Sequence, residues 1–197
     1  MMKKTILTLV AAIALSGISL AQSTVWKGDN SHSSITFSIA HMVISETEGQ
    51  FSDYEVTVKA DKDDFTDAQY EVVIQAGSID TDDEKRDGHL KSGDFFDVAQ
   101  YETITFKGSK FEQVDGKNYK VTGELTMHGV TKTVTLDAKF NGTIKDPWGN
   151  TRAGLKIWGA INRTEFGLQY NSVMEAGGLM IGEEVNLDIN EELIKQG

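Results

Sequence analysis

The sequence contains no cysteine and a single proline, and its basic residues are far outnumbered by acidic ones. Without cysteine the chain has no disulfide, no thiol nucleophile, no zinc–thiolate site and no lipid-modified cysteine. Its 19 Lys and Arg residues against 30 Asp and Glu residues give a net charge of −11. Because binding to a phosphate backbone depends on clustered Lys and Arg, we expect no nucleic-acid partner.

Long hydrophobic runs are also lacking, apart from one near the N-terminus. Lys3 and Lys4 precede the apolar stretch Ile6–Leu15, and the small-residue site Ser19-Leu20-Ala21 follows. This order is typical of a secretory signal peptide. The apolar stretch has about half of the roughly 20 residues that a membrane-spanning helix needs.

We therefore predict a signal peptide over residues 1–21 and one mature domain over residues 22–197. The mature protein is expected to be soluble in a bacterial periplasm, without stable membrane insertion. Loss of Lys3 and Lys4 leaves 17 basic residues against 30 acidic ones, so the mature charge is −13.

Apolar residues in the mature chain recur mainly at every second position, which indicates half-buried strands. Eight segments show this alternation: residues 35–39, 54–58, 70–74, 104–106, 119–127, 134–140, 155–161 and 185–189. Turn-forming sequences lie between several of them, at residues 115–117, 128–129, 146–150 and 177–178. The pattern predicts an all-β antiparallel fold of about eight strands, a sandwich or a barrel, and the length of several strands favours the barrel.

One segment, Thr81–Tyr101, lacks the alternation and predicts a short helical insertion. Thr81 or Asp82 is a candidate N-cap, and the acidic residues that follow suit the positive end of a helix dipole. A second short helical piece is expected to start near Asp94 and to carry Phe95 and Phe96 on its apolar side.

Residues able to carry chemistry are dispersed. The histidines, at positions 32, 41, 89 and 128, match no metal-ligand spacing. The residue types of an acyl-transfer triad occur in the cluster Asp29, Ser31, His32 and Ser33, but adjacent side chains on a strand point to opposite faces. We therefore expect no catalytic residue, no metal site and no cofactor.

Several motifs resemble those of the YceI family of exported bacterial proteins, and the resemblance covers residues 24–191. The most specific is the run from Ser78-Ile79-Asp80-Thr81 to Asp94-Phe95-Phe96-Asp97, with Arg86-Asp87-x-His89-Leu90-Lys91-Ser92 between. The others are Asp29-x-x-His32-Ser33 followed by Phe37 and His41, Gly49-x-Phe51, Ile104-Thr105-Phe106, Gly123-x-Leu125-Thr126, Gly129-Val130-Thr131-Lys132 and Asn162-Arg163-x-x-Phe166-Gly167. Tyr101-Glu102 stands where family members often have Tyr-Pro.

The resemblance implies a lipocalin-like barrel that binds a polyisoprenoid, such as an isoprenoid quinone, or another amphiphilic lipid without catalysing a reaction. Storage or transport of that lipid in the periplasm is the expected function. Alternatives are a stress-related structural or interaction protein whose barrel interior is merely core, and a barrel enzyme acting on a lipid-like substrate. The oligomeric state is left open, and an exposed apolar mouth could support a homodimer.

Alternation, together with the insertion, supplies the candidate cavity residues. They are Phe37, Ile39, Val56, Ile74, Phe95, Phe96, Phe106, Leu125, Leu136 and Ile157. The insertion is expected to close or gate one end of the cavity, with Arg86, Asp87 and His89 attaching it to the barrel. A polar head group would sit at the mouth, where Arg86, Lys91, Arg152 and Arg163 are the basic residues to consider, although a surface or ion-paired role is favoured for each.

Overall fold

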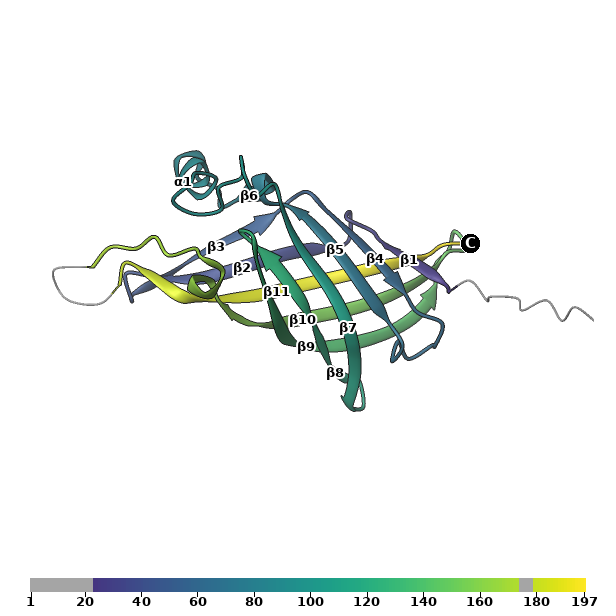
Figure 1. Cartoon of the computed structure of the whole chain (residues 1–197). Helices are drawn as coiled ribbons and strands as arrows, with labels where there is room; N and C mark the ends of the chain where they lie inside the picture. The colour runs from purple at the N-terminus through teal and green to yellow at the C-terminus, as the bar shows by residue number, and fades with distance from the viewer. Residues whose placement is uncertain (1–22, 174–178) are drawn as a thin grey trace, which may run out of the picture.

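Eight antiparallel strands close into a barrel in the computed structural model, which describes residues 23–173 and 179–197 (Figure 1). The strand segments are β1 (Val25–Gly28), β2 (Ser34–His41), β3 (Ser45–Phe51), β4 (Tyr54–Lys59), β5 (Gln69–Gln75), β6 (Ile79–Asp80), β7 (Thr103–Asp115), β8 (Asn118–Met127), β9 (Val130–Lys145), β10 (Thr151–Asn162) and β11 (Ile181–Lys195). The helices are η1 (Ala76–Ser78), α1 (Glu84–Leu90) and η2 (Arg163–Phe166).

Three of the eight strands are interrupted in the middle, which accounts for the larger number of segments. β11 pairs with β2 along its first part and with β1 at its end, so β1 and β2 together form one bent strand. The neighbouring strand consists of β3 and β4, because β3 pairs with β2 and β4 pairs with β1. η1 separates β5 from β6 in the third. The predicted all-β antiparallel barrel of about eight strands is confirmed, and each alternating segment lies in a different strand.

Alternation of apolar and polar residues decides which side chains enter the barrel. In β8, every second residue is buried, and the residues between them are exposed or half-buried; the buried ones are Tyr119, Val121, Gly123, Leu125 and Met127. Hairpins at Gly116 and at His128-Gly129 join β7 to β8 and β8 to β9, with positive φ at all three positions. The predicted turn at residues 146–150 joins β9 to β10. The predictions for residues 1–21 and 177–178 lie outside the described residues.

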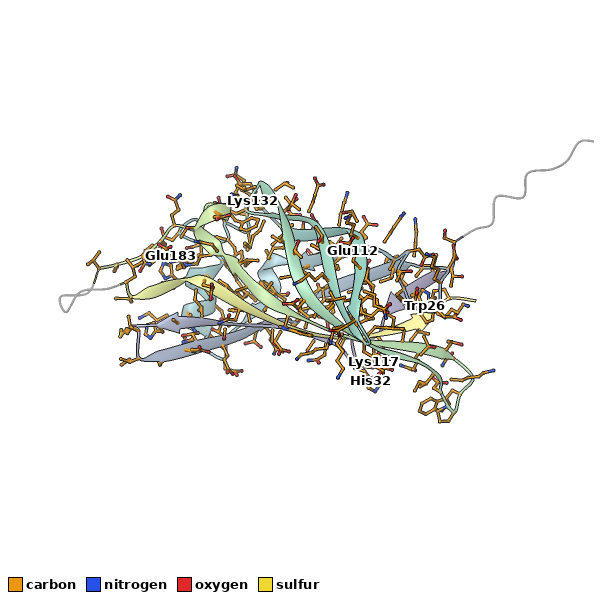
Figure 2. The ribbon with its side chains drawn as sticks, turned by 90° about the horizontal axis from the view of Figure 1, so that it is seen from below. Trp26, His32, Glu112, Lys117, Lys132 and Glu183 are labelled. Atoms are coloured by element: carbon orange, nitrogen blue, oxygen red, sulfur yellow. The ribbon has the colours of Figure 1, made fainter. Side chains whose placement is uncertain are left out.

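One end of the barrel is filled by aromatic side chains. Phe65 packs against Trp26 and Phe140 with ring centroids 5.1 and 4.9 Å apart, and Phe111 stacks on Tyr119 at 4.5 Å. Phe65 and Leu193 are 0% exposed and Phe111 is 2% exposed. This cluster forms a solid floor, and Trp26 and His32 lie toward this end in Figure 2, whereas Glu183 lies toward the other.

The insertion lies at the end opposite the floor, with α1 on the same side as the tips of β2 and β3 (Figure 1). Asp83 is the N-cap of α1, accepting from the backbone N–H groups of Lys85 and Arg86 at 3.0 Å, so the predicted caps Thr81 and Asp82 were wrong. The second helical piece predicted near Asp94 is also wrong, because residues 93–96 and 98–100 form turns. Within the described residues, no helix is long and apolar enough to cross a membrane.

Candidate functional site

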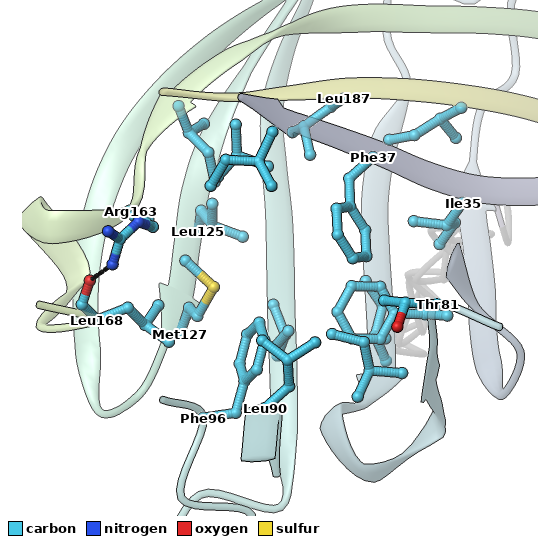
Figure 3. Close-up of a pocket in the computed structure, with 18 of the residues that line it drawn as sticks. Ile35, Phe37, Thr81, Leu90, Phe96, Leu125, Met127, Arg163, Leu168 and Leu187 are labelled. Carbon is cyan, nitrogen blue, oxygen red and sulfur yellow. Dashed lines mark hydrogen bonds between the residues drawn. The ribbon is translucent and has the colours of Figure 1, made fainter. Parts of the chain in front are cut away.

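A cavity of about 810 Å³ occupies the barrel between the aromatic floor and the insertion. Its wall is formed mainly by aliphatic and aromatic side chains from the barrel strands, with Leu90 and Phe96 of the insertion at one end (Figure 3). Phe95 of the insertion also lines the cavity. Several wall residues, among them Phe37, Ile39 and Ile157, are only half-buried although they point into the barrel. Their incomplete burial reflects the open interior and distinguishes this part of the barrel from the close-packed floor.

The structure places all ten candidate cavity residues on this wall. They are Phe37, Ile39, Val56, Ile74, Phe95, Phe96, Phe106, Leu125, Leu136 and Ile157. Eight come from strands, where the inward side chain recurs at every second position. A role of these residues in ligand binding stays a prediction.

The insertion is attached to the barrel by a polar network around Thr81, at the end of β6. Arg86 donates from Nε to Thr81 Oγ1 at 2.7 Å and from Nη2 to the Thr81 carbonyl at 2.6 Å. Asp87 accepts from the Thr81 N–H at 3.0 Å and from its hydroxyl at 2.6 Å. His89 instead contacts Asp94 within the insertion, at 2.9 Å. Arg86 and Asp87 therefore hold α1 beside β6, and His89 braces the turn that follows.

Two phenylalanines of the insertion have different surroundings. Phe95 is 6% exposed and packs between His89 and Tyr170, with both ring centroids 5.0 Å away. Phe96 is half-buried and meets Phe51 edge-on with ring centroids 6.0 Å apart. Phe95 thus anchors the insertion, whereas Phe96 covers part of the cavity.

Basic residues at the open end include Arg163 and Arg86. Arg163 is 4% exposed and donates to the carbonyl oxygens of Gly182, at 2.8 Å, and Leu168 (Figure 3). Burial lowers the pKa of Arg163, and the nearby charge of Glu183 opposes this shift. Both arginines line the cavity. They are two of the four basic residues considered from the sequence as contacts for a head group at the mouth. Lys91 does not line the cavity.

Arg152, the remaining candidate, belongs to an ion-pair cluster at the opposite end. It donates to Asp29 and Asp146, both at 2.7 Å, and to Glu192. Hydrogen bonds from Ser31, Arg152 and His32 hold the pKa of Asp29 well below its usual range. The Arg152 contact is the main reason that the pKa of Asp146 is lowered to about 2. This cluster ties the β1–β2 turn to the β9–β10 hairpin and β11.

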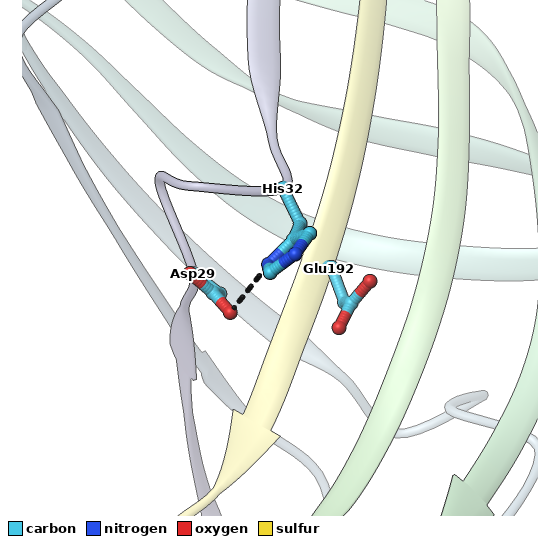
Figure 4. Close-up of side chains that lie close together, drawn as sticks. All are labelled: Asp29, His32 and Glu192. Carbon is cyan, nitrogen blue, oxygen red and sulfur yellow. Dashed lines mark hydrogen bonds and ion pairs between the residues drawn. The ribbon is translucent and has the colours of Figure 1, made fainter. Parts of the chain in front are cut away.

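Asp29, His32 and Glu192 bring their ligand atoms within 4.8 Å of one another (Figure 4). The guanidinium of Arg152 already binds both carboxylates, supplying the positive charge that they require. The contacts are therefore explained by an ion-pair cluster, and we assign no metal to it.

The triad-like residues show a different geometry from the one expected. Residues 29–32 form a turn, not a strand, and their side chains do meet. However, the Ser31 hydroxyl and the Asp29 carboxylate both contact Nδ1 of His32, each at 3.0 Å. A hydrolase triad needs the hydroxyl and the carboxylate on different ring nitrogens. The expectation that these side chains point to opposite faces of a strand was wrong, but their arrangement still lacks the geometry of a catalytic triad.

Among the polar residues of the cavity wall that sequence reasoning missed are Tyr70 and Glu191. Glu191 continues the inward series Val185, Leu187 and Ile189 of β11, so alternation carried the signal. It was concealed because Glu191 lies in an acidic stretch that resembles solvated surface.

Comparison with known proteins gives the same fold and family. A UPF0312 protein of Staphylococcus aureus (strain USA300) is 38% identical over 165 residues, covering 83% of this chain and 94% of that protein. The Campylobacter jejuni YCEI protein structure has 30% identity and a TM-score of 0.69, covering 80% of this chain and 90% of that one.

Two more distant structures share the fold. BcnA of Burkholderia cenocepacia has a TM-score of 0.73 and 22% identity, covering 84% of this chain and 98% of that one. A polyisoprenoid binding domain from Saccharophagus degradans, implicated in plant cell wall breakdown, has a TM-score of 0.63 and 17% identity. The match covers 87% of this chain and 98% of that one. The model of the YceI-like domain matches residues 26–193, and the chain belongs to the YceI-like family.

Proposed function

We propose that this protein binds a long-chain isoprenoid or a related amphiphilic lipid in its barrel cavity and stores or carries it in the bacterial periplasm without catalysing a reaction. The observation that carries the proposal is the apolar cavity of about 810 Å³. A barrel whose interior served only as core would be filled by its own side chains, as it is at the aromatic floor.

The wall chemistry suits a hydrocarbon chain. Burial of apolar surface is worth roughly 25 cal/mol per Å², so each prenyl unit that enters adds to affinity without any charged contact. Leu125, Leu136 and Ile157 come from three different strands and line the same space. A flexible apolar tail can therefore be held from several sides.

The family relationship supports the ligand class. The Saccharophagus degradans domain with the same fold is described as polyisoprenoid binding. The N-terminal pattern of Lys3 and Lys4, an apolar stretch and a site ending at Ala21 supports export. The triad-like residues lack triad geometry, which supports a binding role over hydrolysis.

Native mass spectrometry of protein purified from a bacterial host, followed by lipid extraction, tests this function. We expect a bound mass that is released by solvent and identified as an isoprenoid or similar amphiphile. Ile157→Trp, which places a larger side chain in the cavity, should lose most of that mass. Val114→Trp on the outer surface, where Val114 is 60% exposed, is the matched control and should keep it. Wild-type protein without any lipid, and unable to take one up, would refute the proposal.

A further inference from the structure

The inner end of the cavity contains two polar side chains without partners. Tyr70 and Glu191 are 6% and 7% exposed, and both line the cavity. Among the described residues, neither the Tyr70 hydroxyl nor either carboxyl oxygen of Glu191 has a hydrogen-bond partner. Burying such groups unpaired costs free energy, so each calls for an explanation in a native structure.

Both residues lie directly above the aromatic floor. Glu191 is opposite Leu155 in the β10–β11 register, and both line the cavity. The next inward residue of β11, Leu193, is 0% exposed and belongs to the floor. The ring of Tyr70 packs against Phe111 of the floor, with centroids 5.4 Å apart. The two unpaired groups therefore lie at the deepest level of the cavity.

The carboxyl group of Glu191 points toward the β1–β4 side of the barrel, which is also the side of Tyr70. A Cβ atom on Gly28 would come within 2.6 Å of Glu191 Oε1 and 3.1 Å of the Val56 Cβ, so glycine leaves room for the carboxyl group. Val56 belongs to β4, which pairs with the strand that carries Tyr70.

The charge state of this inner end is set by its surroundings. Burial is the main cause that raises the pKa of Glu191 to about 8, and the charge of Asp29 also raises this pKa. The nearby Ser33 hydroxyl acts in the opposite direction, because it favours the charged carboxylate, although it does not complete a hydrogen bond. Burial and the Glu191 charge also raise the pKa of Tyr54 to about 12. Burial is the main cause that raises the pKa of Tyr70. Glu191 and Tyr70 are thus neutral hydrogen-bond donors near pH 7.

We propose that Tyr70 and Glu191 form a subsite, at the inner end of the cavity, for a neutral oxygen-bearing head group such as a hydroxyl or carbonyl. This inference rests on the proposed function and adds the orientation and class of the ligand: its polar end enters first. An anionic phosphate is disfavoured there, because the cationic side chains among the lining residues, Lys85, Arg86 and Arg163, belong to the insertion and to η2 at the open end.

Two probes with the same tail test the subsite: geranylgeraniol and geranylgeranyl phosphate, titrated into delipidated protein. We expect wild type to bind the alcohol at least about tenfold more tightly than the phosphate. Tyr70→Phe and Glu191→Leu should each weaken alcohol binding about tenfold, because each removes a hydrogen bond in an apolar site. Glu192→Gln changes the neighbouring carboxylate outside the cavity and should leave the preference intact.

Two further readouts separate a binding role from a structural one. Glu191→Leu should unfold at a higher urea concentration, because it removes an unpaired buried acid, although it binds the alcohol less well. Alcohol binding by wild type should weaken as pH rises through about 8, when Glu191 ionises, whereas Glu191→Gln should not show this step.

Equal or tighter binding of the phosphate, with the same preference in all three cavity variants, would place the head group elsewhere and overturn the subsite alone. Binding of neither probe, together with a lipid-free native mass spectrum, would overturn the proposed function instead.

Discussion

Arg152 has a structural role at the closed end, because it joins carboxylates from three separate parts of the chain. Asp29 belongs to the β1–β2 turn, Asp146 to the β9–β10 hairpin and Glu192 to β11. The two aspartates have pKa values below that of an unfolded Asp, so they bind protons less readily in the folded protein. Their ion pairs therefore contribute stability that depends on pH.

This linkage predicts the direction of acid sensitivity. The contribution of Asp146 is complete above about pH 5, where an unfolded Asp is almost fully ionised, and is lost as the pH falls toward its folded pKa of about 2. Urea midpoints measured from pH 6 to pH 2 should fall more steeply in wild type than in Arg152→Ala, which is less stable at pH 6. Parallel curves for the two proteins would show that Arg152 does not set these pKa values. Asp63→Asn serves as an exposed control.

Val43 occupies a backbone conformation that costs energy for a β-branched residue. Its φ is 64°, and that of Met42 is 53°, so the β2–β3 turn has two residues in the left-handed region. Val43 is also 74% exposed, which leaves little side-chain packing to offset the strain. Such turns normally contain Asn and Gly.

Val43→Gly should therefore stabilise the protein by about 1 kcal/mol. For a domain of this size, that corresponds to an increase of about 2–4 °C in the melting temperature. Ile44→Gly, one residue later and outside the positive-φ region, should be neutral or destabilising. A lower melting temperature for Val43→Gly would mean that the valine makes a contact that outweighs its backbone strain.

At the scale of elements, the insertion is the part best placed to control access to the cavity. It is held at Thr81 by Arg86 and Asp87, whereas Phe96 extends over the cavity wall. Removing the Phe96 ring opens the covering without breaking the attachment. Phe96→Ala is therefore expected to release bound lipid about tenfold faster, with a small change in stability.

The double variant Phe95→Ala/Phe96→Ala should also lose the packing of Phe95 against Tyr170 and be less stable by about 3 kcal/mol. Stopped-flow dissociation of a fluorescent prenyl probe measures the rates, and Val114→Ala is the control on the outer face of β7. Unchanged affinity and dissociation rate in a folded Phe96→Ala variant would count against a gate.

The strands were predictable from sequence because each has one side toward the barrel interior and the other toward water. Alternation such as Val185, Leu187 and Ile189 against polar neighbours directly reports this environment. The insertion was harder to predict because its shape depends on particular backbone hydrogen bonds that its composition does not reveal. The positive φ of Asp97, at 44°, and the backbone N–H groups of Phe95 and Asp97, which both donate to the Ser92 carbonyl, give turns where local composition suggested a second helix.

Seen as a whole, the barrel divides into a packed aromatic end and an open apolar end, and only part of this division is visible in the sequence. Inward positions such as Phe106 and Leu136 follow from periodicity. Whether inward side chains meet or leave a cavity depends on barrel radius and on side chains from distant strands, as in the contact of Phe65 with Trp26 and Phe140. Glu191 was missed for a different reason, because its acidic neighbours in the sequence make this inward position resemble solvated surface.

The open interior has a consequence for the stability of the whole molecule. In delipidated protein the cavity lining lacks the contacts that a filled core would make, and a lipid that binds only the folded state supplies them. At a free lipid concentration of about 100 times Kd, binding should stabilise the fold by about 2.7 kcal/mol. We therefore expect delipidated protein to melt about 5–10 °C below the same protein reloaded with geranylgeraniol. Differential scanning calorimetry measures this difference, and Ile157→Trp should show little of it because its cavity is already occupied. Equal melting temperatures for loaded and delipidated wild type would show that the lipid does not bind preferentially to the folded barrel.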